Sequence, residues 1–203
     1  MTATTDTPQE KWSRHYDLCL TAGKRRFYWK NKDRGVTLTD WRLAWTADGK
    51  DDSAPLQNIA KVRMQSAGDF KNPLNQCQIT FRDGYTLTVH DGNEYGAVDD
   101  AKTPVYRDFI HALHARLALA PPGTISFIRG LPETNHTVVT VAGFILALML
   151  VGIPVVLMVM FWKWEIFFVL LGGAGFCWPI YQMAKKNAPR PYDPNHPPGE
   201  LME

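Results

Sequence analysis

VVTVAGFILALMLVGIPVVLMVMFW, residues Val138–Trp162, is the stretch of sequence that decides the architecture. Its 25 residues contain no charged side chain. As an α-helix they would extend about 37 Å, which is more than the roughly 30 Å hydrocarbon core of a bilayer. Gly152-Ile153-Pro154 predicts a kink in this helix, because proline removes a backbone hydrogen bond and crowds the preceding turn. A purely soluble protein is therefore not expected.

A second uncharged run follows almost at once. Ile166–Ala184 has 19 residues, and only Lys163-Trp164-Glu165 separates it from the first run. So short a connection predicts a transmembrane helical hairpin over 138–184, with antiparallel helices at 138–162 and 166–184. The alternative, a buried helical hairpin in a soluble protein, would need more surrounding protein than this chain supplies. Two spans also exclude a polytopic transporter.

Small residues recur in both predicted helices. Gly143 and Ala147 lie one helical turn apart, and Gly172, Gly173 and Gly175 cluster in the second helix. Such positions allow backbones to approach closely. They predict helix packing, either between the two helices of the hairpin or against another membrane protein. Neither span contains a polar residue that would suggest an ion path, so transport is not expected.

The cations near the ends of the spans predict the orientation. Arg129 precedes the first helix, and Lys185, Lys186 and Arg190 follow the second, whereas Lys163 lies alone at the tip. Because cytoplasmic flanks carry the excess of Lys and Arg, we expect an integral membrane protein with both termini in the cytoplasm. The N-terminal residues MTATTDTPQE show no cleavable signal.

The rest of the chain has the composition of a soluble domain. It carries 40 of the 42 charged residues, and the formal net charge of +2 is too small to indicate nucleic-acid binding. The three cysteines, Cys19, Cys77 and Cys177, have no paired spacing, so neither disulfides nor a zinc site are expected. The composition indicates no metal and no cofactor.

Alternation of apolar and polar residues dominates between Trp12 and Ala120. Gly35–Thr46 predicts two strands that meet at a turn near Asp40. Gln76–Phe81 and Tyr85–His90 predict a hairpin around Arg82-Asp83-Gly84, because an Asp-Gly turn between alternating runs is a strong hairpin signal. Further strands are predicted at Ile59–Met64, Arg26–Lys30 and Tyr16–Leu20.

A helical pattern follows these strands. Thr103 is the predicted N-cap and Pro104 the first helical residue, and Pro121-Pro122-Gly123 is expected to stop the helix. The apolar stripe of this helix consists of Tyr106, Phe109, Ile110, Leu113 and Leu117. We therefore expect an α+β chain: a small antiparallel barrel or sandwich capped by one helix, followed by the transmembrane hairpin.

Two segments resemble a known family. Thr37–Leu43 (TLTDWRL) is similar to the LT-D-x-RL strand pair of bacterial pleckstrin-homology-like (PH-like, GRAM-type) domains, and Pro55–Val62 (PLQNIAKV) to the PL-x-x-I-x-x-V segment that follows it. The resemblance covers residues 12–120 and implies a PH-like scaffold without implying a ligand. Bacterial members often carry transmembrane helices, so it implies a bacterial inner membrane. Two segments depart from the pattern, the acidic Asp48–Asp52 and the polar loop Asp91–Lys102.

A basic cluster is the strongest candidate binding patch. In phosphoinositide-binding relatives a basic first hairpin holds lipid phosphates, and cations near a bilayer are attracted to anionic headgroups. The alternative is a solvated basic edge that discourages aggregation between strands. The candidate lipid- or partner-binding residues are Lys24, Arg25, Arg26, Lys30, Lys32 and Arg34.

No catalytic motif is present in the sequence. His111, His114 and Asp108 are spaced so that they could lie along one side of the predicted helix, but metal binding would need a further ligand and a dry pocket. Since that side is opposite the apolar stripe, solvent exposure is expected instead. We find no nucleophile elbow, phosphate-binding glycine loop or zinc-ligand pair, so no enzyme is expected.

The remaining segments complete the predicted organisation. Residues 1–11 are expected to be a disordered N-terminus, 121–137 a juxtamembrane linker and 185–203 a proline-rich cytoplasmic tail. The tail either stays disordered or folds back onto the domain through Pro189–Tyr192 and Leu201-Met202.

These features predict a non-catalytic, membrane-anchored adaptor or scaffold. Its cytoplasmic PH-like domain would bind a protein partner or anionic lipid at the inner membrane surface. The alternative is an accessory subunit of a larger integral-membrane complex, which it would contact through the transmembrane hairpin. An enzyme with an unrecognised site is a third hypothesis.

Overall fold

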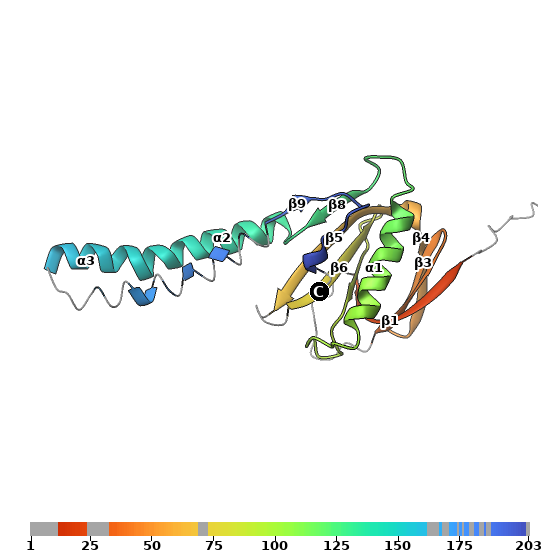
Figure 1. Cartoon of the computed structure of the whole chain (residues 1–203), viewed down its shortest axis with the longest axis horizontal. Coiled ribbons are helices and arrows are strands. Elements are labelled where there is room, and N and C mark those ends of the chain that lie inside the picture. The colour runs from red at the N-terminus through yellow and green to blue at the C-terminus, as the bar shows by residue number, and fades with distance from the viewer. Residues whose placement is uncertain are drawn as a thin grey trace, which may run out of the picture. The chain divides into compact units, whose positions relative to one another are not determined.

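The computed structural model describes residues 12–23, 33–68, 73–161 and 188–201, together with 167, 171–173, 175, 177–178, 181–182 and 185. The chain forms two compact units (Figure 1). Unit 1 comprises Met1–Ile128 and Pro191–Glu203, and unit 2 comprises Arg129–Arg190. The predicted strand at Arg26–Lys30 and the predicted disordered N-terminus at 1–11 lie outside the described residues.

A nine-stranded sheet organises the chain, with strand order β4-β3-β2-β1-β7-β6-β5-β8-β9. The helix α1 (Thr103–Leu117) and two short 3₁₀ turns, η1 (Leu56–Asn58) and η3 (Gly199–Leu201), complete the elements associated with it. The strands are β1 Ser13–Ala22, β2 Arg34–Thr39, β3 Arg42–Ala47, β4 Lys50–Pro55, β5 Ile59–Gly68, β6 Pro73–Phe81, β7 Thr86–His90, β8 Ser126–Arg129 and β9 Arg190–Pro191.

The predicted fold class is wrong in two respects. The sheet is not a small barrel or sandwich confined to residues 12–120, since β8 and β9 come from the expected linker and tail. A two-helix transmembrane hairpin is not found either. Within the described part of the chain, only His136–Phe161 forms a helix long and apolar enough to span a bilayer. Most of the predicted second span, Ile166–Ala184, lies outside the described residues.

Short-range turn chemistry explains the hairpins. At the β2–β3 turn, the Thr39 hydroxyl donates to the carbonyl of Arg42 and accepts from its backbone N–H, at 3.2 Å and 3.1 Å. At the β6–β7 turn, Gly84 adopts a φ of 84° and the Asp83 carboxylate accepts from the Tyr85 N–H, as the Asp-Gly signal predicts.

The β3–β4 turn uses a second Asp-Gly pair. Asp48 and Gly49 both have positive φ, 52° and 69°, which is the conformation of the tight turns that join antiparallel strands. The acidic segment that departs from the PH-like pattern is thus a turn followed by the edge strand β4.

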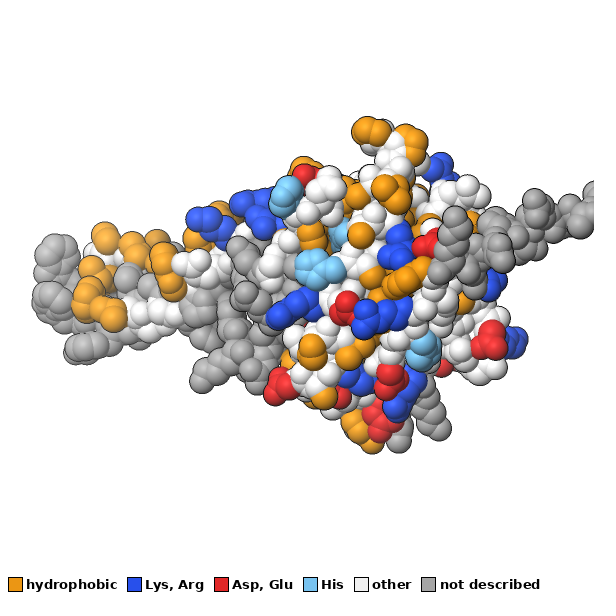
Figure 2. Space-filling model, turned by 45° about the vertical axis from the view of Figure 1, so that its right-hand side comes forward, with side chains coloured by type: hydrophobic (Ala, Val, Ile, Leu, Met, Phe, Trp, Pro, Cys, Tyr) orange, Lys and Arg blue, Asp and Glu red, His pale blue; other side chains and the backbone are white. Residues whose placement is uncertain are grey.

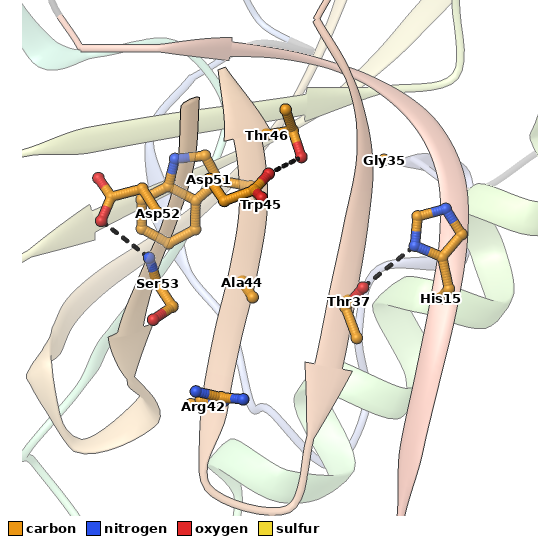
Figure 3. Close-up of a pocket in the computed structure, with 10 residues that line it drawn as sticks. All are labelled: His15, Gly35, Thr37, Arg42, Ala44, Trp45, Thr46, Asp51, Asp52 and Ser53. Carbon is orange, nitrogen blue, oxygen red and sulfur yellow. Dashed lines mark hydrogen bonds between the residues drawn. The ribbon is translucent and has the colours of Figure 1, made fainter. Parts of the chain in front are cut away.

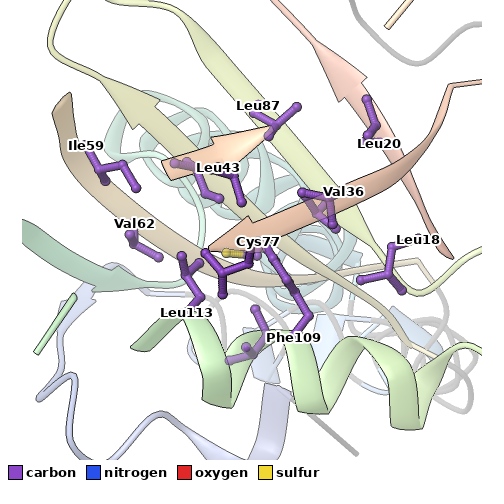
Figure 4. Close-up of a cluster of buried hydrophobic side chains, with 14 of the residues drawn as sticks. Leu18, Leu20, Val36, Leu43, Ile59, Val62, Cys77, Leu87, Phe109 and Leu113 are labelled. Atoms are coloured by element: carbon purple, nitrogen blue, oxygen red, sulfur yellow. The ribbon is translucent and has the colours of Figure 1, made fainter. Parts of the chain in front are cut away.

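The predicted apolar stripe of α1 is confirmed. All five of its side chains are buried, and Figure 4 shows Phe109 and Leu113 projecting from the helix toward the sheet residues Val62 and Cys77. The rings of Tyr16 and Phe109 meet edge to face, with centroids 5.3 Å apart. Thr103 is the first helical residue rather than the N-cap; Lys102 precedes it without a side-chain cap.

The C-terminal segment packs into unit 1. Leu201 is 8% exposed and belongs to the same hydrophobic core as α1 and the sheet. The backbone N–H of Tyr192 donates to the carbonyl of Phe127 at 3.2 Å. Of the two alternatives for the tail, the described residues therefore show the folded-back one.

Unit 2 contains the helical segments α2 (Glu133–Ala147), η2 (Leu148–Gly152) and α3 (Ile153–Phe161), which together include the continuous apolar helix His136–Phe161. The η2 segment is a π-helical turn that ends at Gly152, two residues before Pro154. Proline cannot donate to the carbonyl four residues earlier, at Leu150, so the backbone irregularity lies where the sequence predicts a kink.

Candidate functional site

A polar hollow of about 480 Å³ lies on strands β1–β4 (Figure 3), and we refer to it as the outer pocket. Its floor is a row of directly opposed residues across four strands: His15 pairs with Thr37, Thr37 with Ala44, and Ala44 with Ser53. Alternate residues of these strands, such as Val36, face the core. Because the methyl group of Ala44 is the smallest side chain in this row, the row is hollow at its centre. The outer pocket is lined by His15, Gly35, Thr37, Arg42, Ala44, Trp45, Thr46, Asp51, Asp52 and Ser53.

Hydrogen bonds fix the acidic end of the outer pocket. The Thr46 hydroxyl donates to Asp51 Oδ1 at 2.7 Å, and the backbone N–H of Ser53 donates to Asp52 Oδ1 at 2.8 Å. Asp52 pairs directly across the strands with Trp45, whose buried indole stacks on Phe81 and Tyr85 with ring centroids 5.5 Å and 5.8 Å away. Two carboxylates therefore lie at this end, and the Asp51 carboxylate is held beside Thr46.

Arg42 lies at the opposite end of the same strand. It is four residues before Thr46 on β3, a separation of about 13 Å along the strand. Its guanidinium lies 5.1 Å from the centre of the Trp41 ring, which positions the charge. The outer pocket thus carries a positive charge at one end and negative charge at the other.

His15 forms one wall of the outer pocket. Its Nδ1 lies 3.1 Å from the Thr37 hydroxyl. Gly35 has a φ of 96°, and a Cβ at this position would come within 3.0 Å of the imidazole Cε1. The packing of this ring therefore depends on glycine at position 35.

A second hollow in unit 1, of about 510 Å³, is mainly apolar, and we refer to it as the apolar groove. The guanidinium of Arg116 lies 3.5 Å from the centre of the Trp12 ring and 3.6 Å from Asp40 Oδ1, so the groove is bordered by an ordered cation. Leu119 is 85% exposed at its rim. The lining includes Trp41, Leu56, Leu117, Leu119, Pro121 and Ile125.

Two further polar groups are buried and have structural roles. Asp91 Oδ1 and Oδ2 accept from the backbone N–H and the side-chain amide of Asn75, both at 2.9 Å. Burial raises the pKa of Asp91 above its ordinary value, although these hydrogen bonds oppose the shift. Burial lowers the pKa of His90 to about 4, and the nearby Lys102 acts in the same direction.

His114 is buried rather than solvent-exposed, which corrects the sequence prediction. Its exposed fraction is 2%, its Nδ1 lies 2.8 Å from the carbonyl of Ile110, and its Nε2 lies 2.7 Å from the Tyr192 hydroxyl. A carbonyl can only accept, so Nδ1 carries the proton and Nε2 accepts from Tyr192. Burial lowers the pKa of His114 to about 4.

The other candidates for a metal site do not converge with His114. Asp108 forms an ion pair with Arg14 at 2.7 Å. No group of three or more metal-ligating side chains occurs among the residues whose placement is described.

Of the six residues of the predicted basic cluster, the structure describes only Arg34. Arg34 begins β2 and pairs with Cys19 of β1. The other five cations, Lys24, Arg25, Arg26, Lys30 and Lys32, lie outside the described residues.

Three of the predicted helix-packing residues are at least half-buried in unit 2. Gly143 and Ala147 are half-buried on α2. Gly173 is buried, and a side chain there would collide with the backbone carbonyl of Leu150. Among the described residues, no atom lies within 4 Å of the place that a side chain at Gly172 or Gly175 would occupy.

No protein-family model matches this chain, and no curated protein sequence matches it. One solved structure with a match is described as "The hSac2 domain from human phosphoinositide phosphatase Sac2". The two sequences are 10% identical, and the match covers 63% of this chain and 81% of that one, with a TM-score of 0.38. This similarity is too low to carry an argument about fold or function.

Proposed function

We propose that this chain is a non-catalytic adaptor anchored in a membrane. The apolar helix His136–Phe161 holds unit 1, a PH-like module, at the cytoplasmic surface of the inner membrane. There unit 1 binds a protein partner or anionic lipid headgroups. Tethering is the mechanism, because a tether raises the effective concentration of anything else on that surface.

The observation that carries this proposal is the exposure of the apolar helix. Phe144, Val159 and Met160 are 71%, 67% and 71% exposed, and apolar side chains gather along unit 2 in Figure 2. A core helix of a soluble protein would be covered by other protein, whereas an exposed apolar surface this long requires lipid or a partner.

The first and last described segments of the chain are expected to lie on the same side of the membrane. Trp12 and Leu201 pack against the same core of unit 1, so the first and last described segments belong to one folded body. Arg129 lies just before α2, where a cytoplasmic flank is expected to carry cations. We therefore propose that unit 1, with the first and last described segments, lies on the cytoplasmic side of the membrane.

The apolar groove is the surface of unit 1 that best suits a protein partner. Interfaces are centred on apolar and aromatic side chains with a polar rim, and here Trp41 and Leu119 are accompanied by Arg116 and Asp40. An exposed leucine at the rim has no evident role in the stability of unit 1.

The test is purification of the full chain from native membranes in mild detergent, with identification of all retained proteins. A partner that is retained by the unaltered chain and lost with Leu119→Asp supports the adaptor. Tyr95→Ser, at another exposed site of unit 1, is the matched control and retains the partner. Purification without any stoichiometric partner or bound anionic lipid would contradict the proposal.

The same experiment separates the adaptor from an accessory subunit. An integral-membrane partner that is insensitive to Leu119→Asp but lost with Phe144→Ser would indicate contact through the apolar helix.

A further inference from the structure

We propose that Arg129 and Arg190 together bind the phosphate of an anionic phospholipid at the base of the apolar helix. Arg129 is the last residue of β8 and Arg190 is the first residue of β9. Both arginines belong to unit 2. The inference rests on the membrane anchor of the proposed function, but it depends neither on a protein partner nor on the apolar groove.

The two arginines lie opposite each other on neighbouring strands. β8 and β9 are adjacent in the sheet (Figure 1), and the backbone N–H of Tyr192 donates to the carbonyl of Phe127 at 3.2 Å. Because β8 leads the chain out of unit 1 and β9 leads it back, the two strands run antiparallel. Arg190 is two residues before Tyr192 and Arg129 is two residues after Phe127, so this register pairs them directly. Directly opposed side chains project from the same face of a sheet, with Cβ atoms about 5 Å apart.

The charge of this pair is not neutralised by neighbouring carboxylates. No hydrogen bond or ion pair joins either arginine side chain to another residue that the structure describes. The flanking sequence is also basic, since residues 129–137 and 185–190 contain four Lys and Arg residues but only one carboxylate, Glu133. Like charges directly opposite each other destabilise a sheet, and a bound anion removes this repulsion. The planar guanidinium groups present parallel N–H donors, which match the oxygens of a phosphate.

The arginine pair lies close to the depth at which lipid phosphates occur. Only residues 130–132 separate Arg129 from α2, and the uncharged stretch begins at Val138, five residues after the start of that helix. Five helical residues extend about 7.5 Å. The polar layer on each side of a hydrocarbon core is about 5–8 Å thick, so insertion of the apolar helix brings the arginines to the headgroups.

Exposed apolar side chains near the pair favour a phospholipid over a free phosphate ion. Val138 and Val141 begin the uncharged stretch and are 62% and 52% exposed. The acyl chains of a lipid whose phosphate is held by the two arginines can cover this apolar surface, whereas a soluble phosphate cannot.

The test is native mass spectrometry of the full chain in mild detergent, titrated with phosphatidylglycerol or with phosphatidylcholine of the same acyl chains. The two lipids differ only in the headgroup, so the comparison isolates its net charge. The expected result is one tightly bound phosphatidylglycerol per chain, held at least about tenfold more tightly than phosphatidylcholine. Inorganic phosphate at the same concentration does not displace it.

Substitutions then locate the site. Arg129→Gln and Arg190→Gln each weaken binding of phosphatidylglycerol by about tenfold, and the double variant binds the two lipids equally. Lys185→Gln removes a cation of unit 2 that lies on neither strand, and Arg82→Gln removes an exposed cation of unit 1; each control changes binding by less than about threefold. The melting temperature of the two arginine variants does not fall, because each substitution removes a contact between like charges.

Three results would overturn the proposal. The first is equal binding of the two lipids by the unaltered chain. The second is displacement of the lipid by inorganic phosphate, which would indicate a site for a soluble anion. The third is a loss with Lys185→Gln as large as that with Arg190→Gln, which would indicate diffuse charge. A chain that floats with membranes but shows no lipid preference refutes this site alone, whereas a chain that does not float refutes the membrane anchor.

Discussion

Replacement of Tyr192 by phenylalanine tests how the C-terminal segment is held. The substitution keeps the ring, which contacts Phe127 and His114 with centroids 5.8 Å and 5.7 Å away, but removes the hydroxyl. His114 Nε2 then loses the donor that lies 2.7 Å away. Since Nδ1 is already engaged with the Ile110 carbonyl, the imidazole cannot exchange its two nitrogens to recover the loss.

The magnitude follows from burial of the acceptor. His114 is 2% exposed, so water cannot readily replace the lost donor. An unsatisfied buried acceptor costs about 1–3 kcal/mol of unfolding free energy. At roughly 2–4 °C per kcal/mol for a domain of this size, the melting temperature of unit 1 should fall by about 2–12 °C.

The assay is thermal unfolding of the full chain in mild detergent, followed by near-ultraviolet circular dichroism. Tyr95→Phe, at a tyrosine that is 56% exposed, serves as the control and should change stability by less than about 0.5 kcal/mol. In a His114→Phe background the loss caused by Tyr192→Phe should shrink by about 1 kcal/mol, because the acceptor is already gone. If Tyr192→Phe were as neutral as the control, the segment after β9 would not be bonded to α1 as described.

Three further predictions concern the buried polar groups and the apolar helix. The unfolding free energy of unit 1 should fall as pH drops from about 6.5 to about 4, because His90 and His114 bind protons in the unfolded chain but stay neutral in the folded one. Each histidine should account for a loss of about 3 kcal/mol, whereas the raised pKa of Asp91 acts in the opposite direction. A flat profile of melting temperature against pH would contradict this. Asp91→Ala should cost about 3 kcal/mol in the same assay, since it removes the acceptor of two buried hydrogen bonds from Asn75, and a loss below about 1 kcal/mol would show that the pair is dispensable. Met149→Arg should oppose membrane insertion by about 3 kcal/mol and lower the membrane-bound fraction in cell fractionation, whereas Met149→Leu should not; equal retention of both would argue that this helix does not enter lipid.

Local sequence signals predicted the hairpins and the helix well. The alternating runs on either side of Asp40 and of Asp83-Gly84 became β2–β3 and β6–β7, and the stripe of α1 is buried as its period predicts. These turns and the helix are determined by residues that are close together in the chain, so their patterns can be recognised in the sequence.

The edge strand β4 was not predicted, although its signal was present. Asp48-Gly49 is an Asp-Gly turn like the one at position 83, but the polar residues that follow it do not alternate with apolar ones. A strand at the edge of a sheet needs little apolar sequence, and an inward-pointing charge such as Asp52 protects it from further pairing. The outer pocket escaped prediction for the same reason, because two of its three charged lining residues, Asp51 and Asp52, lie on β4.

Long-range contacts explain the remaining differences. Nothing in the sequence around His114 reveals that Tyr192 covers it from 78 residues away, so the helical pattern alone predicted solvent exposure. Likewise, β8 and β9 are short strands in segments rich in proline and glycine, and they exist because each completes the sheet beside its neighbour.

The most direct test of the account is the behaviour of the full chain in membranes washed with alkaline carbonate and then floated on a sucrose gradient. The account predicts that the chain rises with the lipid fractions, since the exposed apolar helix His136–Phe161 enters the bilayer. Recovery of the folded chain in the wash, free of lipid, would contradict the membrane anchor on which the proposed function depends.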